Sequence, residues 1–312
     1  MRPLCLCAFV PLCLRVFVPW WFLQAFVTLA AMRIIFITDL HIGAGPSGFH
    51  QQTRFINGES TILTALRQHT CDLLVLLGDQ VESGNAASIS RCVDLFAPLD
   101  VPTIVCLGNH DVDHPPAFDR WQTALRRWPQ ATLADAAIDL LDARVLALNN
   151  HWLDALGTPR LYWQPGSNPI PTLLPQQRDW LHTQLTTHQK PTILAIHAPP
   201  HAIPPSQTGL AKPIHESPAA YTAELAALAK AHPHLRLIIS GHNHVCCPAK
   251  FHTCHVLSLS AISEVPHQFA CIDITPAALT LTVQPLGQLP SGPTPNTQKP
   301  WVPGPSLHNL TL

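Results

Sequence analysis

The strongest constraint on the fold of this chain is the alternation of short apolar runs with longer amphipathic stretches. The short runs are β-branched or leucine-rich and are bounded by polar or turn residues, which predicts strands. These predicted strands are 34–37, 73–77, 103–107, 144–148, 192–196 and 235–239. The amphipathic stretches predict the helices 60–69, 86–96, 118–128, 175–188 and 219–231. Strands and helices that alternate along a chain are typical of α/β architecture.

Polar segments stand directly after most of these predicted strands. They are Asp39-Leu40-His41, Gly78-Asp79, Gly108-Asn109-His110-Asp111, His197 and Gly241-His242-Asn243-His244. Each segment alone has a composition that is common in turns, because Asn, Asp and Gly tolerate tight bends. In open α/β sheets, however, the loops beyond the carboxyl ends of the strands converge on one crevice. Because all the segments occur in order, each just past a strand, we expect their side chains to form one shared site.

The donor groups of these segments are carboxylate oxygens, imidazole nitrogens and an amide oxygen, without a thiolate. This mixture favours Mn, Fe or Zn over Cu(I) or an iron-sulfur cluster. Two cations about 3.5 to 4 Å apart share a bridging carboxylate, and they clamp a phosphate for in-line attack by a metal-bound hydroxide. A histidine beside the metals can protonate the leaving oxygen. The pattern therefore predicts dinuclear-metal hydrolysis of a phosphate ester.

These blocks resemble those of the calcineurin-like metallophosphoesterases, whose pattern is Asp-x-His, Gly-Asp, Gly-Asn-His-Asp or Glu, an isolated His, and Gly-His-x-His. The resemblance spans 33–286. It implies an α/β fold, a sandwich of two mixed β-sheets flanked by α-helices, with the active site at the C-terminal ends of the strands. It also implies the metal ligands: Asp39, His41 and His244 for one ion, Asn109, His197 and His242 for the other, and Asp79 between them.

By the same resemblance, His110 is a catalytic histidine that does not bind metal. It would stabilise charge on the phosphate or protonate the leaving oxygen, and Asp111 would orient its ring. A metal-binding scaffold without turnover is the alternative, but a scaffold has no need of a proton donor such as His110.

Departures from the family pattern narrow the expected substrate. Phosphoprotein phosphatases continue Gly-Asp-x-x-Asp-Arg-Gly, whereas 78–84 lacks the arginine. Lipid-A pathway hydrolases usually lack the histidine found here at position 110. What remains resembles the class III cyclic nucleotide phosphodiesterases, although their members often carry a second histidine near 197–200. We expect a small phosphodiester, a cyclic nucleotide among the candidates, or a phosphomonoester; a nuclease or phosphatase of the same superfamily is the alternative.

The charge balance and the cysteines limit the expected partners. The formal net charge is -1 and no basic run occurs, so an extended nucleic-acid surface is not expected. A small phosphorylated substrate is the expected partner, and the oligomeric state is left open. The 10 cysteines do not form a disulfide ladder, which favours a reducing compartment.

Both ends of the chain differ from the predicted domain, 32–286. Residues 1–31 form a hydrophobic leader, which is either a signal or membrane anchor or a mis-assigned start before Met32. If the leader is a signal or membrane anchor, we expect membrane contact through 4–31 and an exported or membrane-associated protein. If translation starts at Met32, we expect a cytoplasmic protein. The Pro-rich tail, 287–312, is expected to be extended or disordered.

Other notable side chains are expected to have ordinary roles. His201, His215 and His234 lie near Pro-rich or helical turns, which predicts exposed positions. Trp152 and Trp163 precede the helix predicted at 175–188, where they could cover the cleft or pack, and packing is favoured.

Overall fold

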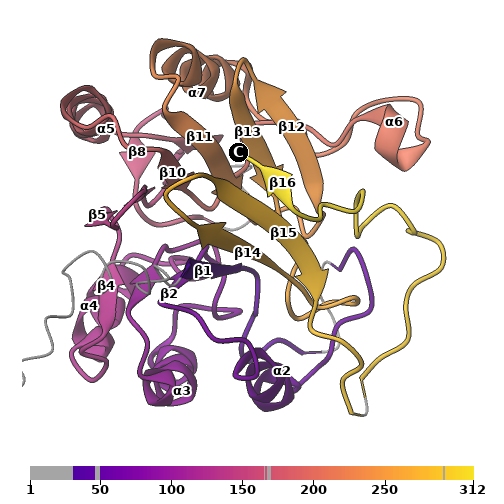
Figure 1. Ribbon diagram of the computed structural model, residues 1–312. Coiled ribbons are helices and arrows are strands. Elements are labelled where there is room, and N and C mark those ends of the chain that lie inside the picture. Colours follow the sequence, from indigo (N-terminus) through magenta and orange to yellow (C-terminus); the bar gives the residue numbers. More distant parts are fainter. Residues whose placement is uncertain (1–30, 46–49, 165, 167–169, 291) are drawn as a thin grey trace, which may run out of the picture. The chain divides into compact units, whose positions relative to one another are not determined.

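The computed structural model describes residues 31–45, 50–164, 166, 170–290 and 292–312 (Figure 1). Residues 32–312 form one compact unit. The predicted leader lies outside the described residues apart from Ala31, so its readings stay predictions. Within the described ranges, none of the helices combines the length and the apolar character that crossing a bilayer requires.

The helices match the predicted stretches, with earlier ends in two cases. α2 and α4 stop where their last residues switch to i→i+3 hydrogen bonds, such as His69 N to Leu66 O and Trp128 N to Leu125 O. The short helices α6 and η1 were not predicted. The helices are α2 (Glu59–Leu66), α3 (Ala86–Phe96), η1 (Ala97–Leu99), α4 (Ala117–Leu125), α5 (Pro175–Thr187), α6 (Pro205–Thr208) and α7 (Ala219–Ala231).

In the part of the chain that the structure describes, the strands form two mixed sheets and one small antiparallel sheet. The first has the order β16-β15-β14-β1-β2-β3-β4, the second β12-β13-β11-β10-β6-β5 and the third β8-β7-β9. The strands are β1 (Met32–Ile37), β2 (Leu73–Leu76), β3 (Thr103–Val105), β4 (Ala131–Leu133), β5 (Ala136–Asp139), β6 (Arg144–Ala147), β7 (His151–Leu153), β8 (Pro159–Arg160), β9 (Ile170–Thr172), β10 (Thr192–Ala195), β11 (Leu235–Ser240), β12 (Cys247–Phe251), β13 (Cys254–Ser258), β14 (Gln268–Ile274), β15 (Leu279–Pro285) and β16 (Leu310–Thr311).

The two large sheets pack face to face, and helices cover their outer faces (Figure 1). Side chains alternate across each strand, so Ile34 and Phe36 enter the core between the sheets while Ile35 and Ile37 face the core beneath α2, α3 and α4. Ile193 likewise faces the other sheet, and Leu194 packs toward α5 and α7. Because both faces of these strands are buried, they read as continuous apolar runs. The predicted α/β sandwich is confirmed.

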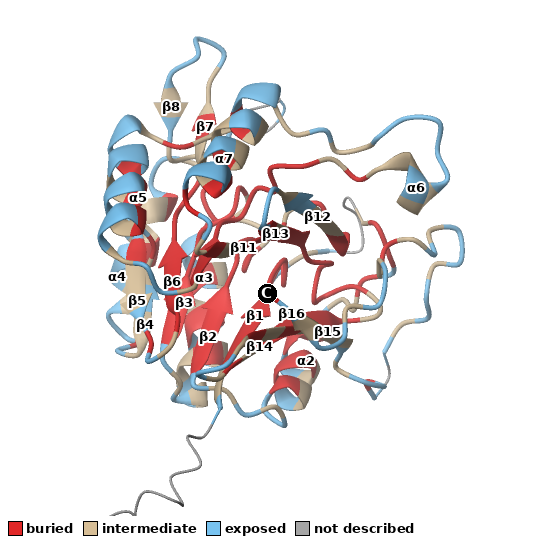
Figure 2. Ribbon diagram, turned by 45° about the horizontal axis from the view of Figure 1, so that its top comes forward, coloured by how far each residue is buried: buried red, intermediate tan, exposed pale blue. Residues whose placement is uncertain are grey.

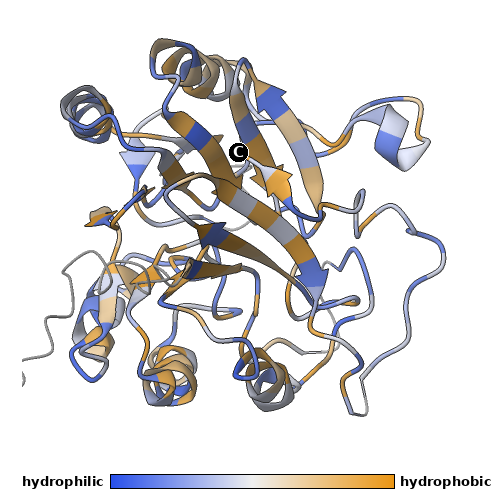
Figure 3. Ribbon diagram, in the orientation of Figure 1, coloured by the Kyte–Doolittle hydropathy of each residue, from blue (hydrophilic) through white to orange (hydrophobic). Residues whose placement is uncertain are grey.

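Burial and hydropathy follow these layers. In Figure 2 the central strands are buried, whereas the outer surfaces of α5 and α7 are exposed. Figure 3 shows hydrophobic residues concentrated along the strands of both sheets. The parallel strands β1, β2 and β3 end at one edge of the first sheet, and the parallel strands β6, β10 and β11 end together in the second. This arrangement positions the polar turns that form the site.

The described part of the Pro-rich tail packs against the rest of the unit. β16 pairs antiparallel with β15, and Val302 is fully buried beside Ile203 and Val245. Gln52 donates to the carbonyl oxygens of Asn296 and Lys299. The described part of the tail contains turns between Asn296 and Gly304 as well as the strand β16. The domain division at residue 286 itself stays a prediction.

Candidate active site

The turns after the strands adopt an uncommon backbone conformation at the predicted ligands. Left-handed φ values are rare for residues other than glycine and gather at functional sites. The predicted ligands with this conformation are Asp39 (φ 55°), His41 (φ 50°), Asp79 (φ 52°), His242 (φ 70°) and His244 (φ 55°). The sharp turns let neighbouring residues on each loop direct their side chains into the same space.

Glycines at these turns allow the loops to approach one another closely. A Cβ on Gly241 would lie 1.8 Å from Thr38 Oγ1 and 2.6 Å from Asp39 Oδ2. A Cβ on Gly108 would lie 2.2 Å from Asp79 Oδ1. The glycine that begins each of these motifs is therefore required by the close contact between loops, in addition to the bend.

The first ligand cluster consists of Asp39, His41 and His244, whose ligand atoms lie within 4.8 Å of one another. His41 Nε2 is 3.1 Å from His244 Nε2. Asp39 Oδ2 accepts hydrogen bonds from Thr38 and from the backbone of His242. Asp39 Oδ1 is buried without a hydrogen-bond partner among the described residues, and it faces the ring nitrogens of His244 at 3.3 Å and His41 at 3.7 Å. An orphaned carboxylate oxygen facing two imidazoles fits a metal ion.

The second cluster lies beside the first, and its Asp79 also faces His41 of the first cluster. Asn109 Oδ1 is 3.2 Å from His197 Nε2 and 2.8 Å from His242 Nδ1. Asp79 Oδ2 is 3.3 Å from His197 Nε2 and 3.9 Å from His41 Nε2, while its Oδ1 accepts the backbone N–H of residue 110. Burial and the positive charge of His197 lower the pKa of His242 to about 3. A single oxygen of Asp79 thus lies between the two clusters.

Three of the four predicted ligand histidines are oriented by acceptors on their far sides. Nδ1 of His41 lies 2.8 Å from Glu82 Oε2, and Nδ1 of His244 lies 2.5 Å from Glu264 Oε1. Nδ1 of His197 lies 2.8 Å from the carbonyl oxygen of Leu77. In each ring Nε2 is left to face the centre. Metal-binding histidines in proteins show this pattern, in which the second nitrogen is held by a carboxylate or a carbonyl.

Buried carboxylates make the site favour bound positive charge. Burial lowers the pKa of His244, but the negative charges of Glu264 and Asp39 more than offset it and raise the pKa to about 10. Burial also opposes the shift at His197, where the charge of Asp79 raises the pKa to about 9. Metal ligands must be deprotonated, so cations would replace these protons. Both the donor set and the charge balance fit two metal ions.

His110 and Asp111 differ from each other in their surroundings. His110 lines the hollow beside the clusters, and its Nδ1 lies 2.9 Å from the carbonyl oxygen of Glu82. Both carboxylate oxygens of Asp111 accept backbone N–H groups instead, from Val81 and Gly108. The expectation that Asp111 orients the His110 ring is therefore wrong, because the Glu82 carbonyl takes that place. Asp111 holds two site turns together, and burial and the charge of Asp79 raise its pKa to about 7.

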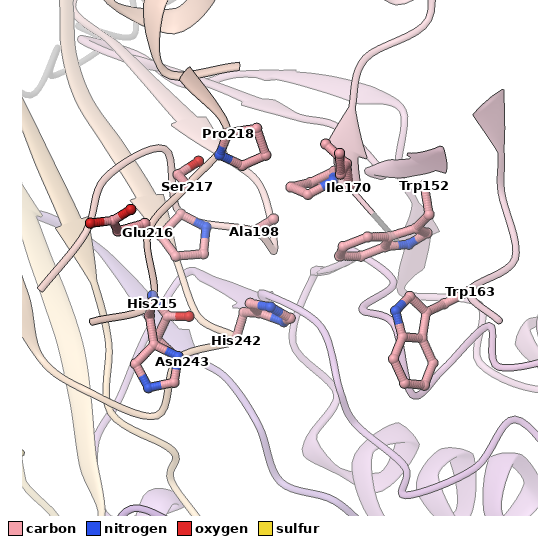
Figure 4. Close-up of a pocket in the computed structure, with 12 residues that line it drawn as sticks. Trp152, Trp163, Ile170, Ala198, His215, Glu216, Ser217, Pro218, His242 and Asn243 are labelled. Atoms are coloured by element: carbon pink, nitrogen blue, oxygen red, sulfur yellow. The ribbon is translucent and has the colours of Figure 1, made fainter. Parts of the chain in front are cut away.

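Two adjoining hollows open above the ligand clusters. The one beside the clusters has a volume of about 220 Å³ and contains His41, Asp79, His110 and Arg54 in its wall. The other has a volume of about 390 Å³ and is shown in Figure 4. His215 lines both hollows and is only partly exposed, so the expectation of an ordinary exposed histidine was wrong.

Two residues that support the site were not predicted from the sequence. Glu264 is fully buried in the loop after β13, and it also accepts hydrogen bonds from the backbone of Gln51 and Gln52. Asn150, just past β6, accepts the backbone N–H groups of His197 and Ala198. Asn150 follows a predicted strand, so its position past the strand end was the signal that could have found it. Glu264 follows no such rule.

The sequence model of the calcineurin-like phosphoesterase family matches residues 32–246, which include most of the site described above. The chain belongs to the calcineurin-like phosphoesterase family. It is a metal-dependent phosphoesterase, a hydrolase acting on ester bonds. The family binds two metal ions, and the His and Asp residues described above are able to hold them.

Relatives and solved structures agree with this family membership. A probable cyclic nucleotide phosphodiesterase of Synechococcus sp. is 28% identical over 213 residues, which cover 68% of this chain and 73% of the relative. The 3′,5′-cyclic adenosine monophosphate phosphodiesterase CpdA of Escherichia coli K12 is 25% identical over 224 residues, 69% of this chain and 70% of CpdA. The structure of a dimetal phosphatase from Danio rerio has the same fold, with a TM-score of 0.62 and 15% identity over 82% of this chain and 97% of that one.

Proposed function

We propose that this phosphoesterase hydrolyses a small phosphodiester at a dinuclear centre and that a cyclic nucleotide is its first candidate substrate. The observation that carries the proposal is the position of Asp79 Oδ2, 3.9 Å from His41 and 3.3 Å from His197, at the side of an open hollow. The names of the relatives in Synechococcus and Escherichia coli support the substrate class.

Each predicted ligand has a place in the proposed centre. Asp39, His41 and His244 would hold one ion, Asn109, His197 and His242 the other, and Asp79 both. The oxygen and nitrogen donors suit Mn, Fe or Zn. When bound, the two ions supply a water of lowered pKa and a clamp for the phosphate oxygens.

His110 is the proposed proton donor to the leaving oxygen. Burial lowers its pKa, but the negative charge of Asp79 and the hydrogen bond to the Glu82 carbonyl raise it above the ordinary value. This shift favours the protonated form of the ring. Because Nδ1 is held by Glu82, Nε2 is the nitrogen left for the substrate.

Replacement of Asp79 tests the proposal directly. Purified protein with Mn²⁺ should hydrolyse bis-p-nitrophenyl phosphate and 3′,5′-cyclic AMP, and Asp79→Asn should abolish both activities because the shared ligand is lost. The matched control is Asp179→Asn, which changes an exposed aspartate on α5 and should retain full activity.

Other outcomes of this assay would contradict the proposal. Turnover that survives Asp79→Asn would rule out the shared centre. Faster hydrolysis of p-nitrophenyl phosphate than of every diester would make the enzyme a phosphomonoesterase. Stoichiometric metal binding without hydrolysis of any ester would leave a scaffold of the same fold.

A further inference from the structure

The hollow of about 220 Å³ beside the ligand clusters is called the metal-side hollow below. The larger hollow adjoins it and lies farther from the clusters. Both have Trp163, His215, His242 and Asn243 in their walls. Figure 4 shows Trp152 and Trp163 on one side, Ser217 and Pro218 on the other, and His242 between them. A molecule with its phosphate at the ligand clusters would therefore extend into this second hollow.

The two hollows differ in chemistry. The metal-side hollow contains the carboxylates of Asp79 and Glu82, imidazoles and the guanidinium of Arg54. Among the described residues that line the larger hollow there is no Lys or Arg. Indole rings, Ile170 and prolines form much of its wall, together with polar side chains such as His215 and Asn243. A second phosphate would meet the carboxylate of Glu216 there and no lysine or arginine of the described lining. A flat, uncharged group would find apolar and aromatic walls, which is the surface that bases stack on.

Trp163 stands at the junction of the hollows in a fixed position. Its backbone N–H donates to the carbonyl oxygen of Val112 at 2.7 Å. Its ring lies parallel to that of His110, with the ring centroids 6.1 Å apart and the planes inclined by 20°. A partly exposed indole held beside the proposed proton donor is a preorganised stacking surface, because ligand binding would cost little ordering of the side chain.

Polar groups in the same walls are not used by the protein itself. Trp152 Nε1 and Ser217 Oγ are buried and have no hydrogen-bond partner among the described residues. Glu216 adds an exposed carboxylate to the lining. These groups, together with His215, His242 and Asn243 in the same lining, suit a nitrogen heterocycle better than an alkyl chain.

We propose that the larger hollow is a nucleobase subsite in which Trp163 is the stacking surface and Ser217 a polar contact. The inference rests on the proposed function, because it places the substrate's phosphate at the ligand clusters. It selects a nucleotide over a glycerophosphodiester, which has no planar ring to occupy the hollow.

Binding of two probes to the Mn²⁺-loaded enzyme separates the two hollows. Titration calorimetry with adenosine 5′-monophosphate reports on both, and titration with inorganic phosphate reports on the metal side alone. The unchanged enzyme should bind the nucleotide more tightly than phosphate. Trp163→Ala should raise the Kd for the nucleotide on the order of tenfold, since stacking on an aromatic ring is lost, and should change the Kd for phosphate much less.

Conservative variants complete the test. Trp163→Phe should restore most of the nucleotide affinity, because it keeps a ring surface. Ser217→Ala should weaken nucleotide binding on the order of fivefold and leave phosphate binding unchanged. Circular dichroism and Mn²⁺ content should match those of the unchanged enzyme in every variant used.

Two results would overturn the subsite: equal affinity of the unchanged enzyme for both probes, or an equal loss of both affinities in Trp163→Ala. The failure of the proposed function looks different. In that case no phosphodiester is turned over, while the preference for the nucleotide and its dependence on Trp163 persist.

Discussion

Glu264 lies behind His244, with Oε1 2.5 Å from Nδ1 of the ring, and it is fully buried. Its carboxylate also faces the guanidinium of Arg54 at 3.7 Å. At the scale of single residues, the ligand geometry therefore depends on a side chain that would not itself touch a metal ion. Such supporting carboxylates fix the ring orientation and increase the basicity of the ligand nitrogen.

Glu264→Gln should weaken metal binding. We expect the Kd for Mn²⁺ to rise by about 10- to 100-fold, because the charge behind the His244 ring is lost. Titration calorimetry on the chelator-treated protein measures this. Glu224→Gln, which changes a surface partner of Arg178, is the control and should have no effect. An unchanged Kd in Glu264→Gln would show that the carboxylate only packs.

His201 was expected to be exposed but is buried, which makes it a source of acid sensitivity. Burial lowers its pKa below 6.5, although the contact of Nε2 with the carbonyl oxygen of Cys247 opposes this. The unfolded chain therefore binds the proton more readily than the folded protein does. The stability that His201 contributes is present above pH 6.5 and is lost as the pH falls toward the folded-state pKa.

The loss of unfolding free energy between pH 7.5 and pH 5.5 should accordingly be smaller in His201→Gln than in the unchanged protein. Urea denaturation at both pH values measures the difference. His308→Gln, at an exposed histidine, should show the same pH dependence as the unchanged protein. If His201→Gln also shows the pH dependence of the unchanged protein, the buried imidazole does not contribute to the acid sensitivity.

At the scale of elements, the tail holds the loop that carries the last ligands. Cys246 lies two residues beyond His244, and its backbone N–H donates to the carbonyl oxygen of Val302. Gln207 connects Cys246 to Trp301 through both of their carbonyl oxygens. A segment of low apolar periodicity is thus ordered by a few buried side chains and by hydrogen bonds to the body.

Val302→Ala should lower the free energy of unfolding by about 2 kcal/mol, because buried methyl groups are removed and a cavity is left. Urea denaturation measures the effect. Ser306→Ala, at an exposed position of the same tail, should change the stability by less than about 0.5 kcal/mol. Equal stability of the two variants would contradict the packing of the tail.

At the scale of the whole molecule, the sandwich concentrates carboxylates that repel one another in one buried place. Asp39, Asp79 and Glu264 are each at most 2% exposed. Positive charge at the site should therefore stabilise the entire fold. This couples metal binding to global stability.

Removal of metal by a chelator should lower the Tm, and Mn²⁺ should restore it. At a concentration of about 1,000 times the Kd, a bound ion contributes about 4 kcal/mol to the free energy of unfolding. Asp79→Asn should gain much less from Mn²⁺, because it lacks the shared ligand. Differential scanning calorimetry compares the two proteins, and an equal gain in both would contradict a centre that depends on Asp79.

The sequence by itself determined the main strands, the covering helices and the turns that bring Asp39, Asp79 and His244 together. These features are local: burial on both faces produces an apolar run, and a polar turn must follow where the strand leaves the sheet. The order of strands that meet at a common edge then places the turns near one another. The short edge strands and β16 had no comparable signal, because few apolar residues mark them.

Only the tertiary structure decided what supports these turns. It placed Glu264 behind His244, the Glu82 carbonyl rather than Asp111 beside His110, and Trp163 at the junction of two hollows. Each of these contacts joins loops whose spacing is set by the packing of the two sheets. A carboxylate, a carbonyl and an indole are chemically ordinary in the sequence, and they acquire their roles from the side chains that the fold brings next to them.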